Sequence, residues 1–312
     1  LGTLTDGDIR RGLLKGMDLN SPIKSLISKK PTVAKISDSE EYILKLALSK
    51  NLQQIPIINK NGKVLGIKEI EELIKIKEKS NKVVLMVGGD GMRLRPLTKN
   101  IPKPMLKVGN KPILHTIVEK FASSGYVNLV MCVNYKSKII QDYFGNGSKF
   151  GVNIEYVFEK KKMGTAGALS LLKKKFLEPF FVMNGDLLTN LNFEKMLDFH
   201  LDNNSEATMC VRKYNAEVPY GVVKLIDENV VSIDEKPKHA FFVNAGIYIL
   251  NPECIKLVPK KFYDMPSLFK KIISNNKKTI SFPLEEYWLD IGRLADYNKA
   301  NTEYYSVFNE II

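Results

Sequence analysis

Three glycines and two cations that follow one apolar stretch carry the clearest chemical signal of the chain. After the apolar residues 83–87 come Gly88, Gly89, Gly91, Arg93 and Lys103. Backbone N–H groups in a glycine-rich turn approach phosphate oxygens closely and form a concavity that binds anions. An arginine just beyond such a turn can hold two phosphate oxygens at once. The segment therefore predicts a triphosphate site.

Spacing excludes two common phosphate-binding motifs. In a dinucleotide-binding fingerprint that includes Gly89 and Gly91, the third glycine would fall on the position of Leu94. A P-loop needs Gly-Lys followed by Ser or Thr, and the chain contains no such triplet. The glycines alone could form a plain strand-to-helix turn. That alternative accounts poorly for Arg93 and for the sequence Pro102-Lys103-Pro104.

Two carboxylates stand in apolar surroundings, where an unpaired charge is costly. Asp186 follows the apolar residues 180–183, and Asp290 lies in the sequence Tyr-Trp-Leu-Asp-Ile-Gly. Mg²⁺ binds one or two carboxylates together with phosphate oxygens and water. Each aspartate alone could be a helix cap or part of a turn, so their assignment to a metal depends on the resemblance described below.

The elements that must position these groups alternate between strand and helix patterns. Strand patterns cover 83–87, 127–133, 153–158 and 180–183, and helical patterns cover 113–121, 136–144 and 166–175. This order predicts a mostly parallel sheet covered on both faces, with ligands at the carboxyl ends of the strands. Strands at 206–213, 220–225, 229–234 and 242–250 are expected to form the acceptor side of a cleft.

Five ordered motifs between residues 82 and 300 resemble those of the sugar-1-phosphate nucleotidyltransferases. They are Gly-Gly-x-Gly-x-Arg-Leu at 88–94, Gly-Thr-Ala-Gly at 164–167, Asn-Gly-Asp at 184–186, Glu-Lys-Pro at 235–237 and Trp-Leu-Asp-Ile-Gly at 288–292. The resemblance implies an α/β, Rossmann-like fold of the glycosyltransferase-A type. The implied reaction is nucleoside triphosphate + sugar 1-phosphate → nucleoside diphosphate sugar + pyrophosphate, with Mg²⁺ as the cofactor. A catalytically weak, nucleotide-sensing regulatory protein is the alternative.

The resemblance also implies roles for individual residues. The catalytic residues would be Arg93, Lys103, Asp186 and Lys236, and the metal ligands would be Asp186 and Asp290. The nucleotide would contact Gly88, Gly89, Gly91, Met92, Arg93, Lys103, Gly164 and Thr165. The sugar 1-phosphate would contact Gly221, Glu235, Lys236 and Asn244. The chain departs from the family pattern at Met92, where Thr is usual, and at Asp90, which would repel a triphosphate unless it points outward or toward the metal.

The Gly-Thr-Ala-Gly sequence is similar to that of enzymes that use GTP. Its small residues at a helix start would leave room for a flat base, although Thr165 could instead be a helix N-cap. Related uridylyltransferases carry similar sequences, so UTP is an alternative to GTP.

An internal repeat marks the first segment, because residues 2–9 align with residues 66–73. The order of patterns before the second copy resembles a cystathionine-β-synthase (CBS) domain, here residues 1–78. Only the tail of the first copy is present, so we expect further residues before Leu1. The resemblance implies that Thr5 and Asp8 contact an adenine nucleotide, whereas the second copy has Glu69 and Glu72 there. A structural or dimerising module is the alternative.

A CBS module before a transferase domain at 82–312 resembles one group of guanylyltransferases. Members of that group activate glucosamine 1-phosphate for sugars of the legionaminic-acid type. GTP with glucosamine 1-phosphate is therefore the first expected substrate pair. Heptose 1-phosphate or mannose 1-phosphate is the second expected acceptor.

Composition narrows the remaining functions. The net charge is +13, but only six of the 47 cations are Arg, and the lysine runs lack interleaved aromatic residues. This pattern disfavours nucleic-acid binding and is typical of a solvated surface. No apolar run approaches the ~20 residues of a membrane helix. Cys132, Cys210 and Cys254 form no C-x-x-C pair, so we expect reduced thiols and a cytoplasmic location. We also expect a homo-oligomer.

Overall fold

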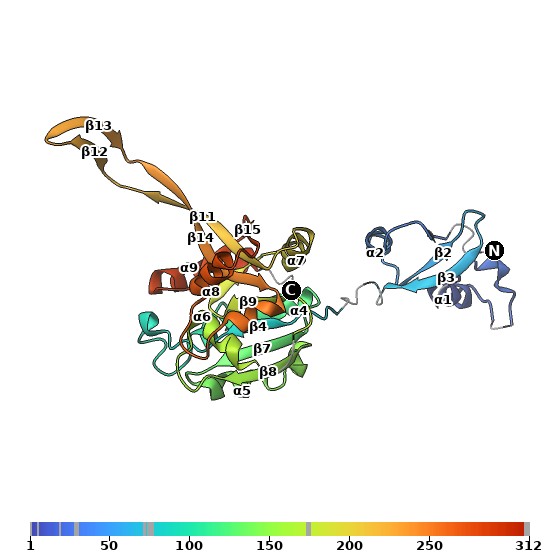
Figure 1. Cartoon of the computed structure of the whole chain (residues 1–312). Coiled ribbons are helices and arrows are strands. Elements are labelled where there is room, and N and C mark those ends of the chain that lie inside the picture. Colours follow the sequence, from blue (N-terminus) through green and yellow to red (C-terminus); the bar gives the residue numbers. More distant parts are fainter. Residues whose placement is uncertain are drawn as a thin grey trace. The chain divides into compact units, whose positions relative to one another are not determined.

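The computed structural model describes residues 2–4, 6–18, 20–27, 31–70, 73, 78–172 and 176–308. The chain divides into two compact units, Leu1–Lys77 and Glu78–Ile312 (Figure 1). The sequence had predicted a boundary between residues 78 and 82. Among the helices in the described ranges, none has both the length and the apolar character that a membrane span requires.

The first unit is a small α+β module. Its strands are β1 (Ala34–Lys35), β2 (Gln54–Ile58) and β3 (Val64–Glu69), with β1 parallel and β3 antiparallel to β2. Its helices include α1 (Asp6–Leu14), the 3₁₀ turn η1 (Ile23–Ser25) and α2 (Glu40–Ser49). Helix α2 begins at Ser39, whose hydroxyl accepts a hydrogen bond from the Tyr42 N–H at 3.2 Å. A small core packs α2 against the sheet and contains Ala34, Ile43, Ala47, Ile55 and Ile70.

The second unit is built on a seven-stranded sheet in the order β15-β11-β14-β9-β4-β7-β8. The strands are β15 (Thr279–Pro283), β11 (Ala207–Glu217), β14 (Lys238–Leu250), β9 (Phe180–Asn184), β4 (Val83–Met86), β7 (Asn128–Val133) and β8 (Asn153–Phe158). Strand β14 alone runs opposite to the others of this sheet. The predicted mostly parallel α/β sheet is confirmed.

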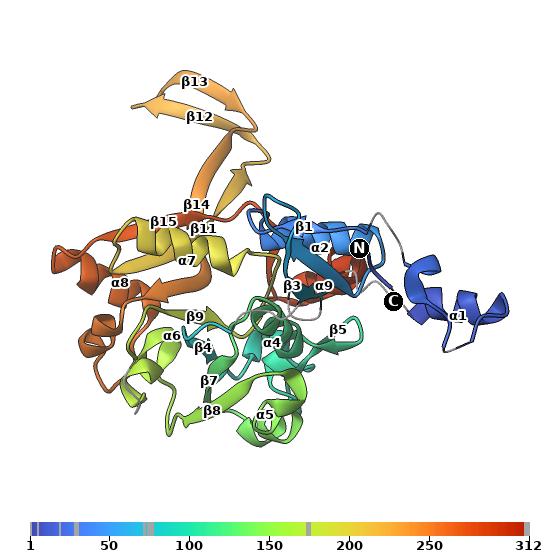
Figure 2. The ribbon, with the colours of Figure 1, turned by 90° about the vertical axis from the view of Figure 1, so that its right-hand side faces the viewer.

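Alternate residues of the central strand β4 enter two separate apolar cores. Val83 and Leu85 pack with α4 (Ile113–Ser123), α5 (Ser137–Phe144), α7 (Phe193–Asp202) and α9 (Leu294–Val307). Val84 packs with the group formed by α6 (Gly164–Gly167), η5 (Ala168–Leu171), η6 (Pro252–Leu257) and α8 (Met265–Ser274). Helices therefore cover both faces of the sheet, as Figure 2 shows. Such double coverage explains the continuously apolar sequences of these strands.

Short elements connect the main strands and helices of this unit. They are η2 (Met92–Leu94), η3 (Lys103–Met105), β5 (Lys107–Val108), β6 (Lys111–Pro112), η4 (Ser148–Phe150), β10 (Leu187–Thr189) and β16 (Trp288–Asp290). The helix predicted over 166–175 is wrong in its bounds. It is one α-turn and one 3₁₀ turn that end at Leu171, and residues 173–175 lie outside the described ranges. Two glycines within its first turn weaken the helical preference.

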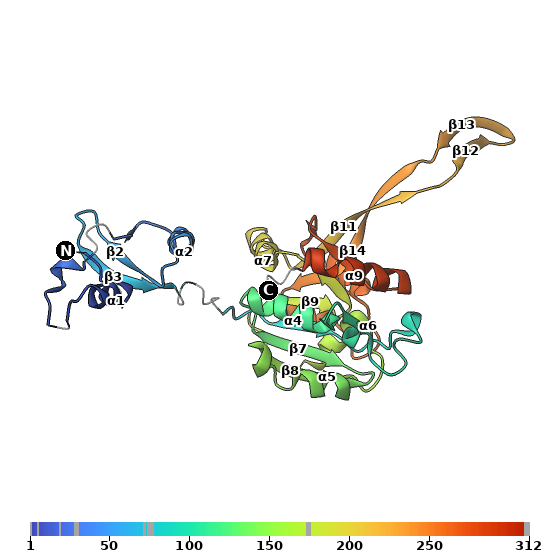
Figure 3. The same ribbon diagram turned by 180° about the vertical axis from the view of Figure 1, so that it is seen from behind.

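A two-stranded extension leaves the sheet. The outer parts of β11 and β14 stay paired as far as Glu217 and Lys238, beyond which lies the hairpin of β12 (Gly221–Ile226) and β13 (Asn229–Glu235). In the views of Figures 1, 2 and 3 this hairpin points away from the sheet. The sequence had predicted strands here on the acceptor side of a cleft. The strands are present, but the paired outer parts of β11 and β14 carry them away from the sheet.

Candidate active site

The glycine loop lies at the carboxyl end of β4, in the middle of the sheet. Gly91 has a φ of 60°, and a Cβ atom added to it would lie 2.9 Å from the Cβ of Lys103. Thr98 Oγ1 donates a hydrogen bond to the Gly91 carbonyl oxygen at 2.8 Å. Only glycine combines this φ with this close approach. The loop is therefore held directly against the segment that carries Lys103.

Asp186 lies beside the loop because β9 is parallel to β4, with Met86 opposite Asn184. Gly185 lets the turn after β9 approach β4, since a Cβ atom there would lie only 2.3 Å from Val87 Cγ1. Asp290 arrives by another route, because β16 pairs antiparallel with β10 and places Asp290 opposite Leu187. The structure thus brings together the two aspartates that the sequence assigned to the metal.

Lys103 links these two carboxylates. Its side chain is 9% exposed, and its ammonium donates a hydrogen bond to Asp186 Oδ2 and lies 3.8 Å from Asp290 Oδ1. Partial burial and the negative charge of Asp186 raise the pKa of Asp290, against the opposing charges of Lys103 and Arg93. The cluster of Lys103, Asp186 and Asp290 therefore has more negative than positive charge and favours a further cation.

Two adjoining hollows of about 250 Å³ each open around this cluster. One is lined by Arg93, Lys103, Asp186 and Gly292 and by the loop from Gly89 to Leu94. The other contains Gly88, Glu159, Met163, Gly164, Thr165 and Phe262. Gly89, Asp90 and Asp186 line both. This arrangement suits a ligand with an anionic part near Arg93 and a flatter part near Glu159.

Asp90, which seemed unfavourable for a phosphate loop, is neutralised by a lysine. Its Oδ2 accepts a hydrogen bond from Lys162 Nζ at 2.6 Å, and this bond lowers the pKa of Asp90. The pair joins the glycine loop to the segment before Gly164. Met92 is exposed at the start of η2, so its backbone rather than its side chain is available to phosphate. The two departures from the family pattern, Asp90 and Met92, therefore leave Arg93 and Lys103 in place at the site.

Glu159 is a site residue that the sequence reasoning missed. It directly follows β8 and lines the second hollow, and Oε2 accepts a hydrogen bond from the Met163 N–H at 3.0 Å. Burial raises the pKa of its carboxyl group. A Cβ atom at Gly88 would lie 2.6 Å from Oε1, so Gly88 makes room for this carboxylate. Searching the carboxyl end of every predicted strand for polar residues would have found it.

Gly164 and Thr165 line the second hollow, but their most evident contacts are with the chain behind it. Gly164 has a φ of 78°, and a Cβ atom there would lie 2.6 Å from the Tyr263 carbonyl oxygen. Thr165 Oγ1 accepts a hydrogen bond from the Met265 N–H at 2.9 Å, at the start of α8. Thr165 is therefore not the N-cap of its own helix, whose N-cap residue is Met163. The small residues of this segment allow it to pack closely against the backbone of residues 261–263.

The residues predicted to contact the sugar phosphate are divided between two places. Gly221 and Glu235 face each other as a pair in the projecting hairpin, and Lys236 follows with a φ of 47°. None of the three lines either hollow in the described part of the chain. Asn244 belongs to the sheet, where its Nδ2 donates to Tyr248 Oη at 2.7 Å and its Oδ1 accepts from the Gly246 N–H at 2.9 Å. Asn244 thus positions β14.

In the N-terminal unit, the predicted adenine-nucleotide contacts are only partly visible. Thr5 and Glu72 lie outside the described residues. Asp8 forms an ion pair with Arg11 at 2.5 Å, one turn later in α1. Glu69 accepts a hydrogen bond from Gln54 Nε2 at 3.3 Å across the β2–β3 pair.

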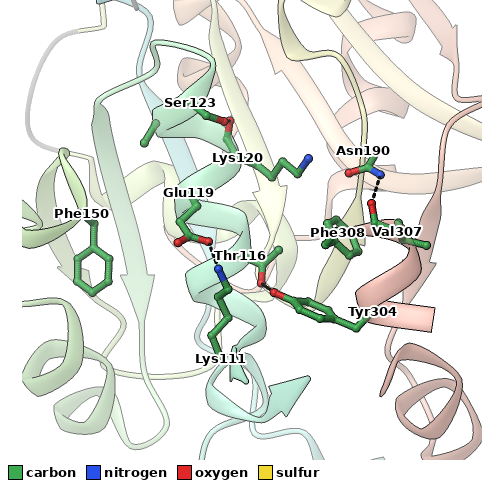
Figure 4. A pocket seen from close by; sticks show the side chains of 11 residues that line it. Lys111, Thr116, Glu119, Lys120, Ser123, Phe150, Asn190, Tyr304, Val307 and Phe308 are labelled. Atoms are coloured by element: carbon green, nitrogen blue, oxygen red, sulfur yellow. Dashed lines mark hydrogen bonds and ion pairs between the residues drawn. The ribbon is translucent and has the colours of Figure 1, made fainter. Parts of the chain in front are cut away.

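A larger cavity of about 680 Å³ lies elsewhere in the second unit (Figure 4). It lies between α4 and α9, where Thr116 pairs with Tyr304 at 3.1 Å and Lys111 pairs with Glu119 at 2.7 Å. Its lining includes none of the loop, Lys103, Asp186 or Asp290. Size alone therefore does not select the candidate active site, which we place where the glycine loop meets the carboxylates.

Comparison with known proteins agrees with this geometry. The family model described as nucleotidyl transferase matches residues 82–307. The mannose-1-phosphate guanyltransferase of Saccharomyces cerevisiae is 36% identical over 236 residues, which are 72% of this chain and 64% of the relative. The enzyme of that name from Schizosaccharomyces pombe is 36% identical over 235 residues, with the same shares. The chain thus spans less than two thirds of the length of these curated relatives.

A solved structure shares the fold. The HddC protein of Yersinia pseudotuberculosis has a TM-score of 0.56 and 26% identity, over 72% of this chain and 99% of that protein. HddC complexed with GMP-PN aligns with the same values. The match to the nucleotidyl transferase family model begins at residue 82, immediately before β4. It includes the glycine loop, Lys103 and both aspartates. This chain belongs to the nucleotidyl transferase family.

Proposed function

We propose that the second unit transfers a nucleotidyl group from a nucleoside triphosphate to a sugar 1-phosphate and releases pyrophosphate. The observation that carries the proposal is the cluster of Lys103, Asp186 and Asp290 beside the glycine loop. A phosphate oxygen of the sugar 1-phosphate attacks the α-phosphorus, and the bond from this phosphorus to the pyrophosphate oxygen breaks. Protein groups contribute positioning and charge stabilisation to such a displacement.

Mg²⁺ is the proposed cofactor, and the residues present fit it. Asp186 and Asp290 lie side by side and supply two carboxylates, which is the usual protein share of a site completed by phosphates and water. When bound, Mg²⁺ would screen the negative charge of the phosphates. Burial and then the negative charge of Asp186 raise the pKa of Asp290, and a bound cation would oppose this shift. Lys103 would then turn from Asp186 toward the α-phosphate.

Guanine is the proposed base. The curated relatives are named guanyltransferases, and the HddC protein forms a complex with GMP-PN. In this chain, Glu159 presents a half-buried carboxylate to the second hollow. Guanine carries two adjacent N–H donors on its pairing edge, and a carboxylate can accept both. Adenine and uracil do not offer this pair of donors.

The acceptor is proposed to be a hexose 1-phosphate. The names of the relatives favour mannose 1-phosphate, and the fusion to a CBS-like unit favours glucosamine 1-phosphate. Lys236 would hold the sugar phosphate and Glu235 the sugar hydroxyls. The N-terminal unit is proposed to be a CBS module that binds adenine nucleotides.

The test measures pyrophosphate release by the purified chain with Mg²⁺. Each of GTP, UTP, CTP, dTTP and ATP is combined with each member of a panel of sugar 1-phosphates. We expect turnover with GTP and one of the two hexose phosphates. Asp186→Asn should abolish turnover and keep the fold, and Lys236→Ala should raise the KM for the sugar phosphate far more than that for GTP. No pyrophosphate release with any pair, from a chain that binds GTP, would contradict the proposed reaction.

A further inference from the structure

The most exposed part of the second unit is its projecting arm, which we define as residues 213–242. The arm consists of the outer β11–β14 ribbon and the β12–β13 hairpin. Every residue of β12 and β13 is exposed, so the hairpin gains no burial from any described part of the chain. A lone two-stranded hairpin is marginally stable in water. The arm therefore needs a surface against which to pack.

The hairpin has one apolar and one more polar face. Residues opposite each other share a face, and the pairs Val223–Ile233 and Leu225–Val230 lie on the same one. The register shifts between these pairs, and Val231, which lies at the shift, belongs to neither set of pairs. All four side chains are between 46% and 62% exposed. On the other face, Val222 lies opposite Asp234, Lys224 opposite Ser232 and Ile226 opposite Asn229. The apolar face is the one that must be covered.

Glu235 belongs to this apolar face, because it lies opposite Gly221, two residues before Val223. Lys236 follows directly at its edge. A surface that packs against the apolar face would therefore also contact Glu235 and the adjacent Lys236.

The cleft itself lacks a cation for a second phosphate group. In the described residues, the cations that line the two hollows are Arg93, Lys103 and Lys162. Lys103 pairs with Asp186, and Lys162 pairs with Asp90. A nucleoside triphosphate requires Arg93 and Lys103 for its own phosphates. A sugar phosphate then needs positive charge that the described lining of the two hollows does not provide.

The ladder of the arm argues against closure onto its own cleft. Five consecutive pairs, from Lys213–Phe242 to Glu217–Lys238, continue β11 and β14 outward. Folding the hairpin back over its own cleft would break or sharply bend this ladder. Reaching a second copy of the chain leaves every pair intact, and exchange of an identical element is a low-cost route to dimers.

Charge also favours such an exchange. The arm contains five acidic and four basic residues, whereas the whole chain has a net charge of +13. The arm is thus slightly acidic and the rest of the chain is strongly basic. Opposite charge favours docking of the arm on the body of another copy.

We propose that two copies of this chain exchange their arms, so that Glu235 and Lys236 of each copy complete the cleft of the other. The apolar face of the hairpin is buried in this exchange. The inference rests on the proposed function in the roles given to Arg93, Lys103 and Lys236. The dimer itself does not depend on those roles.

Complementation between two inactive variants tests the exchange. Asp186→Asn disables the body of a cleft and Lys236→Ala disables the arm. We expect Asp186→Asn alone to be inactive and Lys236→Ala alone to show little turnover when the sugar phosphate is held far below its raised KM. A heterodimer isolated by two different affinity tags contains one cleft with an intact body and an intact arm, so about half of the wild-type activity should return. No recovery in an isolated heterodimer would mean that each arm serves its own cleft, and would overturn the proposal.

Sedimentation separates failure of this inference from failure of the proposed function, because it needs no substrate. Val223→Lys charges the apolar face, and Ser232→Lys makes a matched change on the other face. We expect the wild-type chain and Ser232→Lys to be dimers and Val223→Lys to be a monomer. A monomeric wild-type chain, or a Val223→Lys variant as dimeric as Ser232→Lys, would overturn the exchange. A dimer with this pattern that shows no turnover would contradict the proposed reaction alone.

Discussion

Lys103 and Asp186 form an ion pair at the centre of the candidate active site, with Asp290 3.8 Å from the same ammonium. The lysine therefore occupies the place where positive charge is needed between two carboxylates. Without it, Asp186 and Asp290 would repel each other across a partly buried site. The positive charge of Lys103 and a bound divalent cation thus act on the same two carboxylates.

Lys103→Met should reveal this relation. In the absence of divalent ions, the free energy of unfolding should fall by about 1–3 kcal/mol, because a nearly buried ion pair is broken while Asp186 keeps some contact with solvent. Added Mg²⁺ should raise the melting temperature of this variant more than that of the wild-type chain. The control is Lys107→Met, which removes the same charge from an exposed position on β5. Equal responses to Mg²⁺ in all three proteins would contradict a shared cation site.

Glu159→Gln should weaken the use of GTP. The amide keeps an acceptor for the Met163 N–H but presents N–H donors where guanine also has donors. We expect kcat/KM for GTP to fall about 10- to 100-fold, the usual size of a lost hydrogen bond to a charged group. Activity with UTP, measured in parallel, should change little. Glu155→Gln, the same change within β8, is the control, and an equal loss for GTP and UTP would exclude a role in base selection.

Local sequence patterns predicted the glycine loop and Asp186 at the centre of the candidate site, but they did not predict Glu159. Apolar strands followed by polar residues placed the glycine loop and Asp186 at one edge of the sheet, because parallel neighbours end together. Asp290 could not be placed this way, since β16 has three residues and its pairing with β10 joins segments far apart in the chain. Its metal role came from the resemblance alone.

Two other features depend on contacts that no local pattern contains. Gly164 and Gly167 looked like room for a base, but each is packed against the backbone of residues 261–263. The strands of the arm were predicted within one or two residues at most bounds, yet alternation of side chains does not give the direction of a hairpin. The packing of the two glycines and the direction of the arm both depend on contacts between segments far apart in the sequence.

Gly89 and Gly164 should therefore respond differently to the same substitution. A Cβ atom at Gly89 meets nothing within 4 Å, whereas one at Gly164 would collide with the Tyr263 carbonyl at a φ that disfavours side chains. Gly164→Ala should destabilise the fold by about 1–3 kcal/mol. Gly89→Ala should leave the melting temperature unchanged and raise the KM for the nucleotide, because the methyl group enters both hollows. Denaturation and kinetics of both variants check this. A destabilised Gly89→Ala variant would mean that the loop packs differently.

His200 is buried and is not among the described residues that line the two hollows, and its hydrogen bonds predict an effect on stability at acid pH. Its Nε2 lies 3.1 Å from Asn251 Oδ1, and its Nδ1 lies 2.8 Å from Thr208 Oγ1. Asn251 Nδ2 donates to the Ser205 carbonyl oxygen, so Oδ1 accepts and Nε2 carries the proton. The neutral ring satisfies this network, and burial lowers the pKa of His200.

Acidification should therefore destabilise the fold through His200. The unfolded chain binds a proton near the ordinary histidine pKa of 6.5, and the folded chain binds it only at lower pH. The contribution of His200 is complete above pH 6.5 and declines as the pH falls through that value toward the lowered pKa. His200→Gln keeps a donor for Asn251 and cannot titrate, so its melting temperature should fall less than that of the wild-type chain between pH 7.5 and 5.5. These pH limits bracket the value of about 6.5 for a free histidine. Parallel pH profiles of the two proteins would show that His200 titrates normally in the fold.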